Sequence, residues 1–181
     1  MYEDIKTLAE TLGFTGCAEI SARLVPCDAS LRRFCEQDIC GMYKKSYMCP
    51  PAIGSAQTLI AKLHNYKDVL VFTKEYPCAN PNVREEYLPV QIQHERRSQL
   101  LWKSMQKLCY NSKNAAVLAA GGCHLCETCG IMTGEPCRHP DTALPSVSAY
   151  CIEVGKLSDM LGLSMEGKNG GVVFYCFVLV K

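Results

Sequence analysis

The chain has 181 residues, of which 48% are hydrophobic and 20% charged, and its formal net charge at pH 7 is +1. A chain of this length and composition can bury an ordinary hydrophobic core as one domain. Its cationic residues are scattered, which argues against the basic surface of a nucleic-acid-binding protein. No apolar run approaches the roughly 20 residues that span a bilayer, so we expect no membrane segment.

The first half of the chain predicts two helices and two strands. Apolar residues at helical spacing predict a helix over 2–12, and a strand is expected over 14–25. Ser55 is a suitable N-cap for a helix that ends near His64. A short buried strand is expected over 69–73.

The second half begins with a long amphipathic helix, for which Pro89 suits the first turn and Leu108 marks the end. Strands are expected over 115–120 and at the C-terminal end, with a short helix over 157–161 and a turn over 168–171 between them. The residues of the long helix expected to face inward are Ile92, Leu101, Trp102, Met105 and Leu108.

Alternating strands and helices predict an α/β or α+β fold. We expect a single domain over 1–181, with a sheet of about four strands, flanking helices and cysteine-rich metal-binding loops. The chain has 13 cysteines and begins with an acidic segment that lacks the features of a secretory signal. Reduced thiols in the cytoplasm are therefore expected.

The main chemical motif is a run of cysteines that follows the strand predicted over 115–120. Cys123, Cys126 and Cys129 are each separated by two residues, and Cys137 follows after a short turn. This spacing is typical of loops that hold a [4Fe-4S] cluster. Zinc is the alternative, but structural zinc sites usually combine two separated pairs of ligands.

A second cysteine group lies in the first half of the chain and consists of Cys27, Cys35, Cys40 and Cys49. Cys49 precedes Pro50, as the last ligand of ferredoxin-type sites precedes a proline. The group predicts a second metal site, and buried apolar packing of these thiols is the alternative. Cys27 fits least well, and without it a three-cysteine cluster would leave one iron open.

The remaining cysteines lie on or beside apolar segments and are expected to pack in the core. They are Cys17, Cys78, Cys109, Cys151 and Cys176. His124 and His139, next to the cluster cysteines, are expected to be solvent-exposed neighbours; the alternative is that they donate hydrogen bonds to sulfur or act as ligands.

Motifs of other chemistries are absent from the sequence or incomplete. His94 and Glu95 match the start of the zinc-protease motif H-E-x-x-H, but Ser98 stands where the second histidine belongs. The glycine-rich motifs that bind nucleotide phosphates do not appear after a predicted strand.

Several motifs together are similar to those of a prokaryotic family described as predicted metal-binding proteins. The motifs are Cys35-x4-Cys40-Gly41-Met42-Tyr43-x5-Cys49-Pro50-Pro51, Gly122-Cys123-x-Leu125-Cys126-x2-Cys129, Gly134-x-Pro136-Cys137-Arg138-x-Pro140 and Pro145-Ser146. The resemblance covers nearly the whole chain and implies cysteine ligation in both halves, without implying a reaction. The chain departs from the pattern at Ser148, where a glutamate is common.

These observations favour a protein that binds one or two [4Fe-4S] clusters and passes electrons to an enzyme partner. The alternatives are a non-redox module, which holds zinc or senses iron or oxygen, and an enzyme that uses an open iron. A redox partner protein is expected, and neither nucleic acid nor a membrane is.

Overall fold

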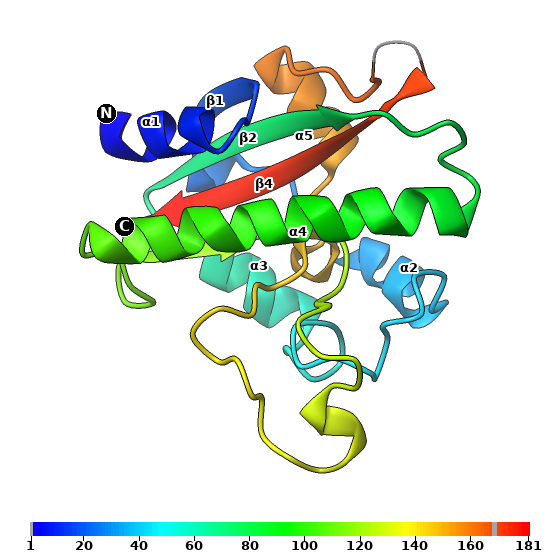
Figure 1. The fold of residues 1–181 in the computed structure, drawn as a ribbon. Helices are drawn as coiled ribbons and strands as arrows, with labels where there is room; N and C mark the ends of the chain where they lie inside the picture. Colours follow the sequence, from blue (N-terminus) through cyan, green and yellow to red (C-terminus); the bar gives the residue numbers. More distant parts are fainter. Residues whose placement is uncertain (1, 168–169) are drawn as a thin grey trace.

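The computed structural model describes residues 2–167 and 170–181. Within them, four strands form one antiparallel sheet in the order β1-β2-β4-β3 (Figure 1). The strands are β1 (Gly16–Ser21), β2 (Asp68–Tyr76), β3 (Ala115–Leu118) and β4 (Val172–Val180). Because every pair is antiparallel, the fold is α+β, which confirms one of the two predicted classes.

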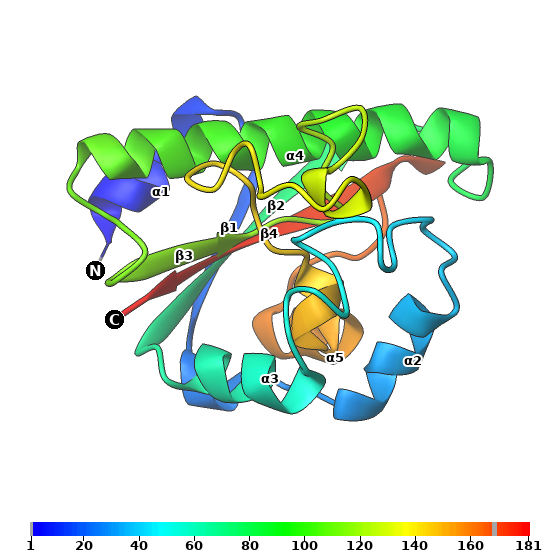
Figure 2. The same ribbon diagram turned by 90° about the horizontal axis from the view of Figure 1, so that it is seen from below.

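Helices cover both faces of the sheet (Figures 1 and 2). On one face lie α1 (Glu3–Thr11) and α4 (Arg84–Lys107), whose Ile5 and Leu101 join one hydrophobic cluster. On the other face lie α3 (Ala56–His64) and α5 (Val154–Leu161), whose Leu63 and Leu157 join a second cluster. The short α2 (Arg32–Glu36) contacts the 3-10 turn Val147–Tyr150 that precedes α5.

The central strands are apolar on both faces because each face packs against helices. In β2, Val69 and Val71 belong to the cluster with α3, whereas Leu70 and Phe72 belong to the cluster with α4. This division follows from the alternation of side chains along a strand. β1, at the edge of the sheet, is instead only half-buried.

Several predicted elements are confirmed, with changed bounds. Ser55 caps α3, because its Oγ accepts a hydrogen bond from the backbone N–H of Thr58 at 3.1 Å. The strand predicted over 14–25 is shorter, since β1 ends at Ser21 and a 3-10 turn follows. The turn predicted at 168–171 lies partly outside the described residues.

The long helix differs most from its prediction. α4 begins at Arg84, so Pro89 lies inside the helix rather than in its first turn. Leu108, predicted to face inward, caps the helix and is 46% exposed. The buried face also carries polar residues that the apolar pattern did not reveal: Gln91, His94, Glu95, Ser98 and Gln99.

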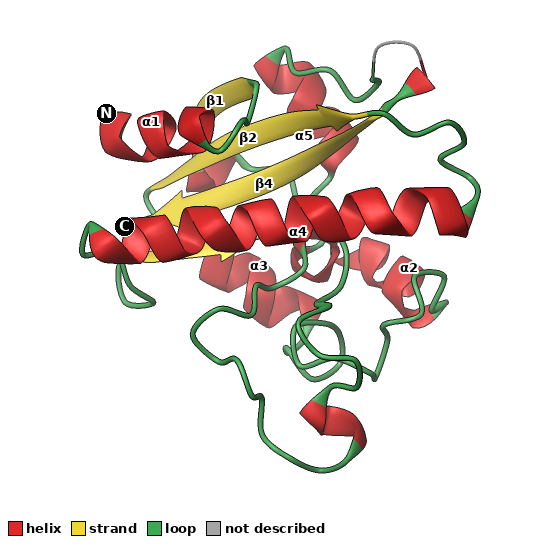
Figure 3. Ribbon diagram, viewed as in Figure 1, coloured by secondary structure: helices red, strands yellow, loops and turns green. Residues whose placement is uncertain are grey.

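Two long loops extend away from the sheet near α2 and α3, and most of their length is irregular (Figure 3). One joins α2 to α3, and the other joins β3 to the turn before α5. In the described part of the chain, no helix has the length and apolar character needed to cross a membrane.

Candidate metal centre

The cysteine loop, defined here as residues 119–146, is closed at its base by backbone hydrogen bonds. Ala119 and Ser146 form a parallel bridge just beyond the end of β3. The N–H of Ala119 donates to the carbonyl of Pro145, and the N–H of Val147 donates to the carbonyl of Ala119, both at 3.0 Å. The sheet therefore fixes both ends of a loop that has little regular structure of its own.

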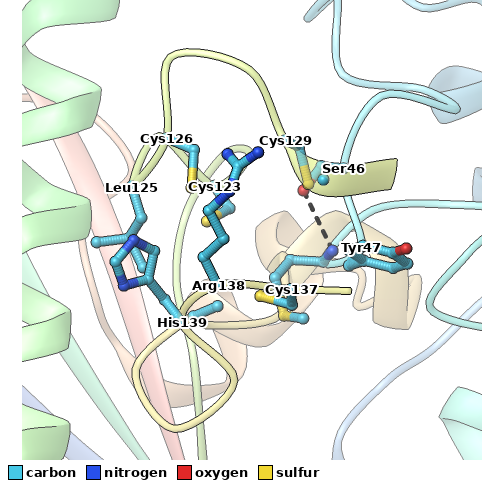
Figure 4. A pocket seen from close by; sticks show the side chains of 12 residues that line it. Ser46, Tyr47, Cys123, Leu125, Cys126, Cys129, Cys137, Arg138 and His139 are labelled. Atoms are coloured by element: carbon cyan, nitrogen blue, oxygen red, sulfur yellow. Dashed lines mark hydrogen bonds between the residues drawn. The ribbon is translucent and has the colours of Figure 1, made fainter. Parts of the chain in front are cut away.

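The cysteine loop brings its four predicted ligands together. Cys123, Cys126, Cys129 and Cys137 line one pocket (Figure 4). All four are partly buried free thiols. Met48 from the neighbouring loop and Leu125 add apolar side chains to the lining. Burial raises the pKa of the Cys123 thiol to about 12.

A tight turn places Cys137 near Cys129. The backbone N–H of Glu135 donates to the carbonyl of Gly130 at 2.8 Å. A side chain at Gly130 would come within 2.6 Å of the carbonyl oxygens of Glu135 and Pro136. Only glycine permits this close backbone approach. The sequence predicted that a turn would bring Cys137 back, but the need for Gly130 depends on the tertiary contact.

Arg138 reaches across the cysteine loop. Its guanidinium donates to the Thr128 carbonyl at 3.0 Å and to Glu135 Oε2 at 2.7 Å. The pKa of Arg138 is raised, mainly by the hydrogen bond to Glu135 and also by Cys126. A positive charge therefore lies beside the sulfur-lined pocket, as Figure 4 shows.

Glu95 of α4 holds the start of the cysteine loop. Its carboxylate is buried and accepts hydrogen bonds from the backbone N–H of His124 at 3.0 and 3.1 Å. It also bonds His124 Nδ1 at 2.9 Å and accepts from Gln99 Nε2 at 2.9 Å. The incomplete protease motif thus contains a residue that positions the loop. His124 is only partly exposed, contrary to the prediction, whereas His139 is exposed as predicted.

The second cysteine group is spread over α2 and the loop that follows. Cys35 lies in α2, while Cys40 and Cys49 lie in the loop before α3. Cys35 and Cys40 line one cavity, and Cys49 is buried beside them. Burial, together with the smaller effects of the charges of Cys40 and Cys35, raises the pKa of Cys49 to about 12. Cys27 does not line this cavity; it forms a bridge with Ile152, and burial and the charge of the neighbouring Cys151 raise its pKa.

The loops that carry the two cysteine groups contact each other. The Tyr47 hydroxyl donates to the Glu135 carbonyl at 2.8 Å, and the Ser146 N–H donates to the Met48 carbonyl at 3.2 Å. After burial and the nearer cysteines, the charge of Cys123 also raises the pKa of Cys49, so these two thiols of different groups lie within electrostatic range of each other. Figure 2 shows the two loops side by side.

The prediction of core packing for the other five cysteines is confirmed for Cys78, Cys151 and Cys176, which are buried. It is wrong for Cys17 and Cys109, which are exposed.

Across residues 2–167 and 170–181, no three His, Cys, Asp or Glu side chains lie close enough to hold one metal ion.

Fold and loops together define an α+β protein with two adjoining groups of cysteines beside one sheet. The chain belongs to the family described as "Predicted metal-binding protein (DUF2284)", whose model matches residues 18–180. This confirms the resemblance inferred from the motifs. Searches among curated proteins and among solved structures found no match.

Proposed function

We propose that the protein holds a [4Fe-4S] cluster on Cys123, Cys126, Cys129 and Cys137 and serves in electron transfer to an enzyme partner. The observation that carries this proposal is that all four cysteines of one loop line one pocket. Thiolates are the usual ligands of such clusters, and the C-x2-C-x2-C spacing is typical of them. Membership of a metal-binding family supports the same assignment.

The four cysteines are ligands of the type that a cluster needs. The cavity between them, however, is large enough for a cluster only if the loop moves. The cavity between the four thiols measures about 20 Å³, enough for little more than a water molecule. Cluster binding therefore requires the loop to move outward. The tip at Gly134 is exposed, and a side-chain atom placed there would meet nothing within 4 Å, so no packed neighbour blocks an outward movement at that point.

When bound, such a cluster supplies a centre that gains one electron from a donor protein and gives the same electron to an acceptor. The chain's own residues hold and surround that centre. Glu95 fixes the start of the loop, Met48 and Leu125 limit access of water, and Arg138 places a positive charge nearby. A nearby positive charge raises a reduction potential, but the Glu135 carboxylate, 2.7 Å from the Arg138 guanidinium, offsets part of this effect.

We further propose that Cys35, Cys40 and Cys49 belong to a second centre. Contact between the two loops would then let electrons pass between two centres. Phe34 and Ile39, which are 49% and 77% exposed, flank Cys35 and Cys40 with an apolar surface suited to a redox partner. Thirteen free thiols fit a reducing compartment, so we propose a cytoplasmic location.

The test is anaerobic purification followed by counts of iron, sulfide and zinc per chain. About four irons are expected for one cubane and about eight for two. Cys126→Ala should lose about four irons and the associated visible absorption. Cys17→Ala, at an exposed cysteine of β1, should lose neither. Zinc in place of iron would support the non-redox alternative, and full iron in Cys126→Ala would overturn the ligand assignment.

A further inference from the structure

Cys151, which the sequence assigns to the core, faces the same cavity as two cysteines of the second group. The cavity has a volume of about 390 Å³ and is lined by Cys35, Cys40 and Cys151 together with apolar side chains such as Leu31 and Ile152. Cys151 itself is 1% exposed. Three thiols thus share a largely apolar cavity, although they come from positions far apart in the sequence.

Two contacts hold α2, which carries Cys35, against the segment that leads to Cys151. The Cys35 thiol donates to the carbonyl of Ser148 at 3.9 Å. From the same helix, the Arg32 guanidinium donates to the carbonyl of Ala149 at 2.7 Å. Both acceptors belong to the 3-10 turn Val147–Tyr150 that ends at Cys151. The end of α2 is therefore fixed against the segment that presents Cys151.

The backbone at Cys151 is also unusual. Its φ of 54° and ψ of 35° place it in the left-handed region, which residues other than glycine rarely adopt. The Asp28 N–H donates to the Cys151 carbonyl at 2.9 Å and helps to hold this conformation. Strained backbone of this kind occurs often at functional sites, where it directs a side chain.

Cys27 occupies a different position. It pairs with Ile152 through an isolated backbone bridge, and burial and the charge of the neighbouring Cys151 raise its pKa. It does not line the cavity, whereas Cys151 does. Cys49 does not line the cavity either, but it is buried, and Cys40 and Cys35 are close enough for their charges to add to the effect of burial in raising its pKa. Of the neighbouring thiols Cys27 and Cys151, only Cys151 lines the cavity with Cys35 and Cys40, so Cys151 is the better candidate for the remaining ligand of the second centre.

We propose that Cys151 is a ligand of the second metal centre, together with Cys35, Cys40 and Cys49, in the place that the sequence gave to Cys27. The inference rests on the proposed function, because it assumes that these cysteines hold an iron–sulfur cluster. Four thiolates give every iron of a cubane its own protein ligand. The second centre would then have no open iron, which favours electron transfer over substrate chemistry at that iron.

The experiment compares Cys151→Ala and the closer isostere Cys151→Ser with Cys27→Ala as the matched control. All are purified without oxygen, and iron is counted per chain alongside electron paramagnetic resonance of the reduced protein. Wild type and Cys27→Ala should hold about eight irons, and the Cys151 variants about four to seven with one altered signal. Far-UV circular dichroism should show that the variants fold.

A result of about eight irons and an unchanged spectrum in both Cys151 variants would overturn the inference. If the wild type holds about four irons, and these are lost in Cys126→Ala but kept in Cys151→Ala, the inference about Cys151 is overturned and the proposed function stands. A wild type that holds no iron would overturn both.

Pulsed alkylation of the wild type decides the question if neither Cys151 variant folds. Metal-loaded and metal-free proteins are labelled over a series of denaturant concentrations, and Cys176, which is fully buried in β4, serves as the non-ligand reference. Loading should slow labelling of Cys151 in step with Cys35 and well beyond any change at Cys176. If metal loading slows the labelling of Cys151 no more than that of Cys176, the inference is overturned.

Discussion

Glu95 shows how one buried charge links the sheet region to the cysteine loop. A carboxylate that is 3% exposed must have hydrogen-bond partners, because an unpaired charge in the interior is costly. Glu95 finds them in the backbone and ring of His124 and in Gln99. The residue directly after the first cysteine is thereby fixed to α4.

Glu95→Gln should weaken this link. The variant keeps the size of the side chain but removes the charge, and hydrogen bonds to a charged group contribute about 1.5–3 kcal/mol. We expect a comparable loss in the free energy of unfolding, measured in urea, and faster loss of iron to a chelator. Glu127→Gln, at an exposed position of the same loop, is the control. Equal stability of both variants would contradict the role of Glu95.

The buried His94 should make the stability of the protein depend on pH. Burial lowers its pKa from 6.5 to about 4. Between these two values the unfolded chain binds a proton that the folded chain does not, so stability falls as the pH falls. From pH 7 to pH 5 the expected loss is about 2 kcal/mol.

Urea unfolding of wild type and His94→Gln at both pH values measures this loss. In the variant, the difference in the free energy of unfolding between pH 7 and pH 5 should be smaller than in the wild type by about 2 kcal/mol. Identical pH dependence of the two proteins would show that His94 does not titrate in this way.

At the scale of elements, α4 has two roles along its length. Its C-terminal half covers the sheet with Leu101 and Met105, whereas its middle contacts the cysteine loop. Gln91 packs directly against Gly121, whose φ of 84° suits glycine, and Trp102 Nε1 donates to the Asp141 carbonyl at 2.9 Å. One helix therefore positions the loop at both of its ends, which explains why Gln91, Glu95 and Gln99 are buried on it.

Pro89 is the weak point of this helix. It lies in the second turn of α4, where it cannot donate a backbone hydrogen bond, and it is exposed. Pro89→Ala should therefore raise the free energy of unfolding, by about 1 kcal/mol or more. Thermal unfolding measures the gain, and Gln93→Ala, also exposed on α4, controls for helix propensity. A loss of stability would instead indicate that Pro89 fixes a bend that α4 needs.

At the scale of the whole molecule, the sheet with its helices and the cysteine loops differ in what stabilises them. The two hydrophobic clusters bury the faces of β2 and β4 against helices. The cysteine loop has only short 3-10 structure, over Gly130–Met132, and many exposed residues. Such a segment buries too little apolar surface to offset its ordering entropy, so ligand bonds should contribute most to its order.

Removal of metal should therefore leave the sheet intact and loosen the cysteine loop. Hydrogen exchange on metal-loaded and metal-free protein should show protection of β2, β4 and α4 in both forms. Around residues 122–146, protection should be present only in the loaded form. Equal protection of this loop in both forms would contradict the expectation, and loss of protection throughout would show that the core does not fold without metal.

Local signals were sufficient for much of the fold. The cap at Ser55, the apolar run of the last strand and the helical spacing of the first helix each act over a few residues, and all three elements are present. The start of α4 was misplaced because proline is favoured in a first turn. In the structure the helix begins before Pro89, where Arg84 bonds the Cys40 carbonyl and Tyr87 packs on Phe174.

The sequence by itself determined the composition of the core, the main secondary structure and the grouping of Cys123, Cys126, Cys129 and Cys137, because these depend on residue type and short spacing. Only the tertiary structure decided the antiparallel order of the strands, the role of Glu95 and the position of Cys151 beside Cys35. Each of these joins residues that are distant along the chain. Such contacts form when apolar faces pack together, and no local pattern records which distant side chains will then meet.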